Sequence, residues 1–206
     1  EVSPDTLVMV DAVSSLSGVK IEMDAWGLDW LLTSSQKCLA LPPGLALGSP
    51  SARAMQKAES VENRGWYLDV VRWNKHRIKD TTPATPVMPL IYALDVQLDR
   101  ILAEGLEQRF ARHAAMADCV QKWAEARGMS IFAQEGYRSK TVVTVNNTRN
   151  IPIGELNKFL LQRGMRISNG YGTLKEKTFR IATMGETTPD DVQILLEAMD
   201  EFIAQM

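Results

Sequence analysis

Cysteine, histidine and long apolar runs are scarce in this chain of 206 residues. The sequence has two cysteines and two histidines, and they are not spaced as the ligands of a metal site. No apolar stretch approaches the roughly 18 residues that a helix needs to span a bilayer. We therefore expect neither a bound metal nor a membrane partner.

An excess of charge of one sign is also absent, because the formal net charge is −2. Such a balance gives no reason to expect a nucleic acid as partner. Cys38 and Cys119 lie far apart in the sequence, and two isolated thiols are typical of a reduced, intracellular protein. The sequence thus predicts a cytoplasmic protein, and its 45% hydrophobic residues are enough for a real core.

Two polar residues follow apolar runs near the start of the chain. The run Thr6–Asp11 predicts a buried parallel strand that ends at Asp11, and residues 28–33 and 45–48 predict two more strands. Lys37 comes just after the second of these runs. A neutral lysine amine can attack a carbonyl and form a Schiff base. An acid and a lysine at neighbouring strand ends could hold the two ends of one small aromatic aldehyde, although a solvated loop lysine and a turn-capping aspartate remain open alternatives.

The middle of the chain changes from short strands to a long helical pattern. Residues 51–62 have helical composition, whereas residues 64–80 show no clean period and are expected to form a loop. Two prolines within residues 80–86 interrupt any helix. Residues 88–127 then predict one long helix, with a kink at Gly105 and a C-cap at Gly128.

The last third of the chain alternates between strands and helices. Strands are expected at 131–133, 141–145, 165–168 and 179–183, and helices at 152–163 and from Thr188 onward. This order predicts a small α+β domain. Neither histidine is expected to be catalytic, because His113 is predicted on a charged helix face and His76 lies between two basic residues.

Five segments resemble those of the class V, fold-type I aminotransferases, in the branch of the alanine–glyoxylate and serine–glyoxylate (serine–pyruvate) enzymes. They occur in family order along the whole chain. They are Val10-Asp11-Ala12-Val13-Ser14-Ser15-Leu16, Ser35-Gln36-Lys37-Cys38-Leu39, Leu41-Pro42-Pro43-Gly44-Leu45, Thr82-Pro83-Ala84-Thr85-Pro86 with the helix start that follows it, and Lys177-Thr178-Phe179-Arg180-Ile181-Ala182-Thr183-Met184-Gly185.

This resemblance implies an α/β fold in three parts. Residues 1–86 would be the end of a mostly parallel large-domain sheet, residues 87–128 a long interdomain helix, and residues 129–206 a small C-terminal α+β domain. Family members are nearly twice as long as this chain, so we expect it to be a C-terminal portion. The N-terminal half would then be a further partner.

The resemblance also implies pyridoxal 5′-phosphate as cofactor and assigns roles to four residues near it. Lys37 would hold the cofactor as a Schiff base and carry the proton during catalysis. Asp11 would pair with the pyridinium nitrogen. Val13 would pack on one face of the ring, and Gln36 would reach the phosphate. From the residues alone, Val13 could equally be an ordinary core residue.

Three further residues acquire roles only through the resemblance. Thr82 and Thr85 match positions that contact the phosphate bound in the neighbouring subunit, which implies a homodimer; a tyrosine often stands where Thr82 is here. Arg180 would bind the substrate carboxylate with a bidentate fork. Taken alone, the threonines could be turn residues, and Arg180 could pair with Glu176 or Asp190 at the surface.

The implied activity is transfer of an amino group from a small amino acid, alanine or serine, to glyoxylate or pyruvate. A cysteine desulfurase-like lyase of the same class is one alternative, although those enzymes usually carry a histidine where Gln36 precedes Lys37. The other alternative is a non-catalytic fragment that needs its missing N-terminal half.

Overall fold

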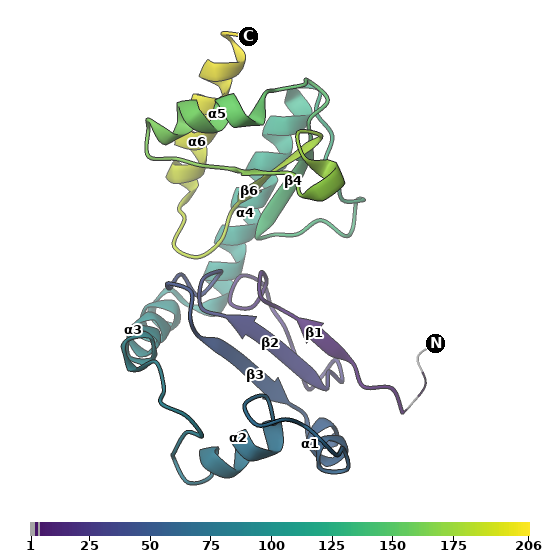
Figure 1. Cartoon of the computed structure of the whole chain (residues 1–206). Helices are drawn as coiled ribbons and strands as arrows, with labels where there is room; N and C mark the ends of the chain where they lie inside the picture. The colour runs from purple at the N-terminus through teal and green to yellow at the C-terminus, as the bar shows by residue number, and fades with distance from the viewer. Residues whose placement is uncertain (1–2, 4) are drawn as a thin grey trace. The chain divides into compact units, whose positions relative to one another are not determined.

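The computed structural model describes residue 3 and residues 5–206. The chain forms two compact units (Figure 1). The first contains the residues up to Leu16 together with Ile21–Arg100. The second contains Ser17–Lys20 together with Ile101–Met206. The boundary after Arg100 lies inside a helix, and each of the other helices and strands lies within one unit.

The first unit is built on a three-stranded sheet in the order β1-β2-β3. Its strands are β1 (Met9–Asp11), β2 (Trp30–Ser34) and β3 (Ala46–Pro50). β1 runs parallel to β2, whereas β3 runs antiparallel to β2. The carboxyl ends of β1 and β2 therefore meet at one edge of the sheet, and the start of β3 meets them there.

Two short helices follow β3 (Figure 1): α1 (Ala52–Glu59) and α2 (Val70–Arg77). The Ser51 side chain caps α1, and the Asp69 carboxylate caps α2 by accepting from the amide of Val71 at 3.0 Å. The expected loop over residues 64–80 is wrong in this part. Only Val71 of α2 is fully buried, so the helix lacks the apolar stripe that would have indicated it.

The long helical pattern is divided in two at Gly105. α3 (Met88–Glu104) ends before this glycine, and α4 (Leu106–Ala126) begins after it. Gly105 has a φ of 86°, a value that residues with a side chain rarely adopt. The predicted kink is thus a full break, while Gly128 ends α4 with a φ of 73°, as expected for a C-cap glycine.

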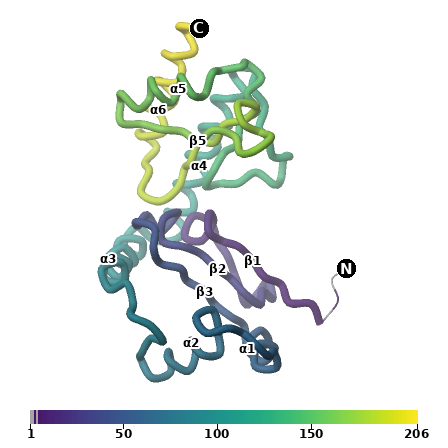
Figure 2. The backbone as a smooth tube through the Cα atoms, viewed as in Figure 1, coloured from purple at the N-terminus to yellow at the C-terminus, as the bar shows by residue number. Residues whose placement is uncertain are grey.

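The second unit pairs an antiparallel sheet with helices. The sheet has the order β4-β6-β5, with β4 (Val142–Asn146), β6 (Thr178–Ala182) and the two-residue β5 (Ser168–Asn169). The helices are α4, α5 (Ile153–Leu161) and α6 (Pro189–Ile203), which are labelled in Figure 2. A 3₁₀ turn spans Gly172–Leu174. The predicted α+β order is confirmed.

Two local expectations in this unit need correction. Residues 131–133 form only a single bridge, from Ile131 to Val145, instead of an edge strand. The expected strand at 165–168 is reduced to Ser168–Asn169. The strands and helices of this unit nevertheless share one core, because the side chains of Val120, Leu156, Phe179 and Met199 are completely buried together.

Candidate functional site

Asp11 and Lys37 leave the first-unit sheet at the same edge. Asp11 is the last residue of β1, and Lys37 comes three residues after β2 ends at Ser34. The parallel register pairs Asp11 with Leu32. The pairing continues for one residue beyond β1, since the amide of Ala12 donates to the carbonyl of Leu32 at 2.8 Å. Ligands of parallel sheets bind outside the carboxyl ends of the strands, so this edge is the candidate site.

The acid at this edge keeps one oxygen available for a ligand. Asp11 is exposed, and its Oδ1 accepts a hydrogen bond from the amide of Val13 at 2.9 Å. Among the described residues, Oδ2 has no partner. The backbone amide fixes the direction of the carboxylate, which leaves Oδ2 free to accept one further N–H. Val13 itself is half-buried, two residues farther along.

Lys37 projects from a loop that is held firmly on both sides. The hydroxyl of Ser35 donates to the carbonyl of Pro42 at 2.7 Å, and the amide of Leu41 returns to the carbonyl of Ser35 at 3.0 Å. Cys38 and Leu39 are buried directly after the lysine. Lys37 is half-buried, and its side chain makes no hydrogen bond or ion pair with any described residue. The loop thus presents a primary amine without a protein partner, and Gln36 beside it is exposed.

Thr82 and Thr85 lie on the segment between α2 and α3, and both are exposed. The hydroxyl of Thr82 donates to the carbonyl of Ala84 at 2.7 Å, which is the turn-forming behaviour expected from the residue alone. Neither threonine has a hydrogen bond to Asp11 or Lys37 among the described contacts.

Arg180 occupies the middle of β6 in the second unit. It is half-buried, and its Nη2 donates to the carbonyl of Asn169 at 3.2 Å. Its Nε is buried without a partner, and within the described part of the chain Arg180 forms no ion pair. The expected surface pairing with Glu176 or Asp190 is therefore absent among these residues. A guanidinium with unused N–H groups can still donate hydrogen bonds to a carboxylate ligand.

Side chains that the sequence did not single out complete the candidate edge. Thr33 is buried and bonds to the backbone next to Asp11, and Ser34 has a buried hydroxyl with no partner. The only signal for them in the sequence is the hydroxyl-rich run Thr33-Ser34-Ser35 just before Gln36. A buried hydroxyl without a protein partner is rare, and it fits a site that binds a polar ligand.

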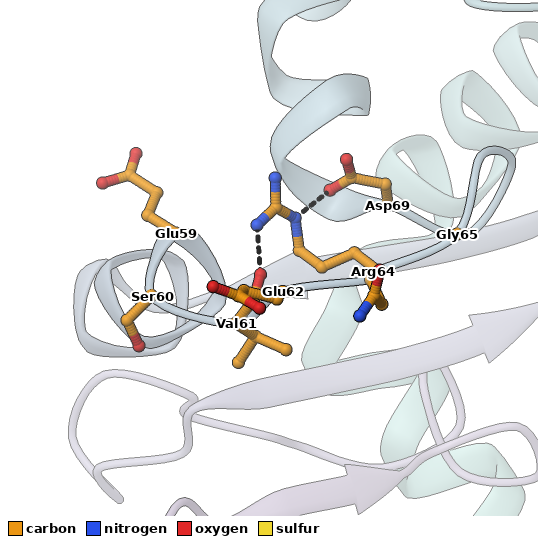
Figure 3. A pocket seen from close by; sticks show the side chains of 8 residues that line it. Glu59, Ser60, Val61, Glu62, Arg64, Gly65 and Asp69 are labelled. Atoms are coloured by element: carbon orange, nitrogen blue, oxygen red, sulfur yellow. Dashed lines mark hydrogen bonds and ion pairs between the residues drawn. The ribbon is translucent and has the colours of Figure 1, made fainter.

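A surface pocket of about 870 Å³ belongs to the other end of the first-unit sheet (Figure 3). It is lined by residues 59–65 and Asp69, after α1. Arg64 crosses it and donates to Asp69 at 2.9 Å and to the carbonyl of Val61 (Figure 3). Because β3 ends opposite the start of β2, α1 begins at the end of the sheet away from Lys37. Arg64 is already satisfied and serves to shape this loop.

A buried ionic cluster supports the start of α4 in the second unit. Glu104 accepts from Arg112 at 2.6 Å and from Arg109 at 2.7 Å, and these bonds, led by that from Arg112, lower the pKa of Glu104 to about 2. His113 is completely buried, which corrects its predicted place on a charged face. Burial lowers the pKa of His113, so it is neutral near pH 7 and fills the core.

Two general expectations can be compared with the described residues. No helix among them is both long and apolar enough to cross a membrane. The same residues contain no cluster of histidine, cysteine or acidic side chains that could hold a metal ion.

The chain belongs to the class-V aminotransferase family, whose sequence model matches residues 3–195. It is 38% identical over 184 residues to an uncharacterized aminotransferase of Methanocaldococcus jannaschii, covering 88% of this chain and 48% of that protein. It is 33% identical over 195 residues to the serine–glyoxylate aminotransferase of Arabidopsis thaliana, covering 92% and 47%.

Solved structures agree with this assignment. The alanine–glyoxylate aminotransferase from Nostoc sp. superimposes with a TM-score of 0.89 at 30% identity, over 96% of this chain and 54% of that one. A NifS-like protein at 16% identity, with a TM-score of 0.70, shares the fold. The fold is thus that of fold-type I aminotransferases, and the chain spans about half the length of the curated relatives it matches.

Class-V aminotransferases depend on pyridoxal 5′-phosphate, and the residues at the candidate edge fit this group. Three groups suit this cofactor: the primary amine of Lys37, which has no protein partner, an unused carboxylate oxygen of Asp11, and the unpartnered hydroxyl of Ser34. An aldehyde needs the amine, and a pyridine N–H needs the carboxylate.

Proposed function

We propose that this chain is the part of a pyridoxal-phosphate-dependent transaminase that carries its lysine and aspartate. The enzyme would move an amino group from a small amino acid, alanine or serine, to glyoxylate or pyruvate. One observation carries the proposal: Asp11 and Lys37 follow the carboxyl ends of adjacent parallel strands, and each keeps a functional atom without a protein partner.

Lys37 and Asp11 divide the chemistry between them. When bound, pyridoxal phosphate supplies a reactive carbonyl carbon and a ring that withdraws electrons from the α-carbon of the substrate. Lys37 Nζ would hold the group and would then act as a general base and acid that moves the substrate proton. Asp11 Oδ2 would accept the N–H of the ring and so keep that nitrogen protonated.

Four further residues are proposed to bind and orient the cofactor. Val13 would pack on one face of the ring, and Gln36 would donate from its amide to the phosphate. Thr82 and Thr85 are proposed to donate to a phosphate bound by the partner in a homodimer; their exposure supports this role. The hydroxyl of Thr82 is already used locally, so Thr85 has the stronger support.

Arg180 is proposed to bind the carboxylate of the amino acid substrate. Its partnerless Nε supports this, because a bidentate fork requires two unused N–H groups. The remaining half of the relatives' length is proposed as a further part of the working enzyme. A cytoplasmic location also belongs to the proposal, and its support is that neither Cys38 nor Cys119 forms a disulfide.

The enzyme assembled from this chain and the remaining half, with pyridoxal phosphate added, should convert alanine and glyoxylate to pyruvate and glycine. In Arg180→Gln the KM for alanine should rise about tenfold or more, because a charge-assisted bond to the carboxylate is lost. Arg166→Gln is the matched control, since Arg166 is an exposed arginine of the same unit. Steady-state kinetics over a range of alanine concentrations measures both variants.

The same assay separates the alternatives. Sulfide released from L-cysteine, with no pyruvate from alanine, would indicate a desulfurase-like lyase instead. An assembled enzyme that binds no pyridoxal phosphate and transfers no amino group would contradict the proposed function, and the chain would then be a non-catalytic fragment.

A further inference from the structure

Thr33 is a buried residue beside the candidate site for which the proposed function has no role. Its side chain is 4% exposed, and its Oγ1 donates to the carbonyl of Ala12 at 3.2 Å. Ala12 is completely buried and stands between Asp11 and Val13. The hydroxyl therefore holds the backbone at the point where the acid-bearing segment leaves the sheet.

Two other contacts hold the same segment, one at Ala12 and one beyond Val13. The amide of Ala12 donates to the carbonyl of Leu32 at 2.8 Å, and the thiol of Cys38 lies 3.3 Å from the carbonyl of Ser14 as its donor. The residues that hold it, Leu32, Thr33 and Cys38, belong to β2 and to the loop that carries Lys37. The segment that presents the acid is thus attached directly to the segment that presents the amine.

The distance between acid and amine decides whether both can reach one rigid ring. A displacement of about 1 Å in such a pair can cost two orders of magnitude in rate, so the supporting shell matters. Of the three contacts, the hydroxyl of Thr33 is the strongest side-chain donor, because a thiol is a weak one. The carbonyl of Ala12 also accepts from the amides of Ser15 at 3.1 Å and Leu16 at 2.9 Å, so loss of the hydroxyl would remove its bond to β2 while these two local bonds remain.

We propose that Thr33 is a positioning residue: its hydroxyl fixes the Asp11–Val13 segment relative to Lys37 and thereby sets the spacing that the cofactor requires. This inference rests on the proposed function for the identity of the ligand. The contact itself exists in the cofactor-free chain, which allows the two to be tested separately.

The test compares Thr33→Val, which removes the hydroxyl at nearly constant volume, with Thr33→Ser, which keeps it. In the cofactor-free chain, hydrogen exchange followed by NMR should show the buried amide of Ala12 exchanging severalfold faster in Thr33→Val. With pyridoxal phosphate added, the dissociation constant of Thr33→Val should rise about fivefold, the worth of one hydrogen bond. Thr33→Ser should restore both values.

Thr183→Val is the matched control. Thr183 is also completely buried, and its Oγ1 donates to the carbonyl of Lys140 at 3.3 Å in the second unit. It should lose similar thermal stability but leave Ala12 exchange and cofactor affinity unchanged. If Thr33→Val behaves like Thr183→Val, the positioning role is overturned. If the unsubstituted chain binds no cofactor, it is the proposed function that fails, and the Ala12 exchange rates still decide whether Thr33 holds this segment.

Discussion

At the scale of single residues, the polar side chains of the first unit fall into two groups. Those at the carboxyl ends of β1 and β2 keep atoms free, as Asp11 and Lys37 do. Those at the opposite end of the sheet are fully engaged. Asp29, which is 2% exposed, accepts from the amide of Val8 at 2.8 Å, from Ser51 at 2.8 Å and from Arg53 Nε at 2.9 Å. The first group marks a candidate ligand site, whereas the hydrogen bonds of Asp29 to Val8, Ser51 and Arg53 form a structural cluster, here called the Asp29 cluster.

The Asp29 cluster predicts how the free energy of unfolding depends on pH. The guanidinium of Arg53, followed by the amide of Val8, holds the pKa of Asp29 far below its usual range. Below the ordinary aspartate pKa of about 3.9, the unfolded chain binds a proton at this residue that the folded chain does not. The contribution of Asp29 is therefore complete above about pH 4 and is lost as the pH falls toward the folded pKa.

Asp29→Asn should lower the thermal midpoint by several degrees at pH 7 and flatten its decline below about pH 4. Thermal unfolding followed by circular dichroism from pH 2 to 7 measures both effects. Asp118→Asn is the control, because Asp118 pairs with Lys140 while 49% exposed, and such pairs contribute little. If the thermal midpoint falls equally steeply below pH 4 in Asp29→Asn and in the unsubstituted chain, the Asp29 cluster does not contribute to stability as proposed.

At the scale of elements, local signals in the sequence located most helices but not their lengths. Thr188 begins α6 with a capping box closed by Asp191, as its acidic first turn indicated. α2 was missed because aromatic and charged residues alternate there without an apolar face, although Asp69 caps it. The antiparallel pairing of β2 with β3 had no local signal at all, since register depends on contacts between distant residues.

The break between α3 and α4 leads to a testable prediction for Gly105. A Cβ added there would lie 2.5 Å from Gln108 Oε1, at a backbone φ of 86°. Gly105→Ala should therefore cost about 1 kcal/mol or more in unfolding free energy. Gly154→Ala in α5, where a Cβ meets no atom within 4 Å, should instead gain about 0.5 kcal/mol. Denaturant unfolding that shows equal changes in both variants would argue against the break as a requirement of the fold.

At the scale of the whole molecule, the family resemblance carried more information than any local pattern. It gave the class, the fold and the cofactor, and these agree with a family match over residues 3–195. It did not give the contacts of Thr33, Ser34 or Cys38, because a motif names functional residues and leaves their support unspecified. The roles assigned to the site residues all stay predictions, namely those of Asp11, Val13, Gln36, Lys37, Thr82, Thr85 and Arg180.

Reduction with borohydride in the presence of pyridoxal phosphate, followed by peptide mapping with mass spectrometry, tests the central claim most directly. Borohydride makes a bond between an amine and the aldehyde permanent, so the attachment point can be found by mass. We expect the label on Lys37, its loss in Lys37→Ala, and its retention in Lys175→Ala, where an exposed lysine is removed. Label distributed over exposed lysines, with none on Lys37, would contradict the account.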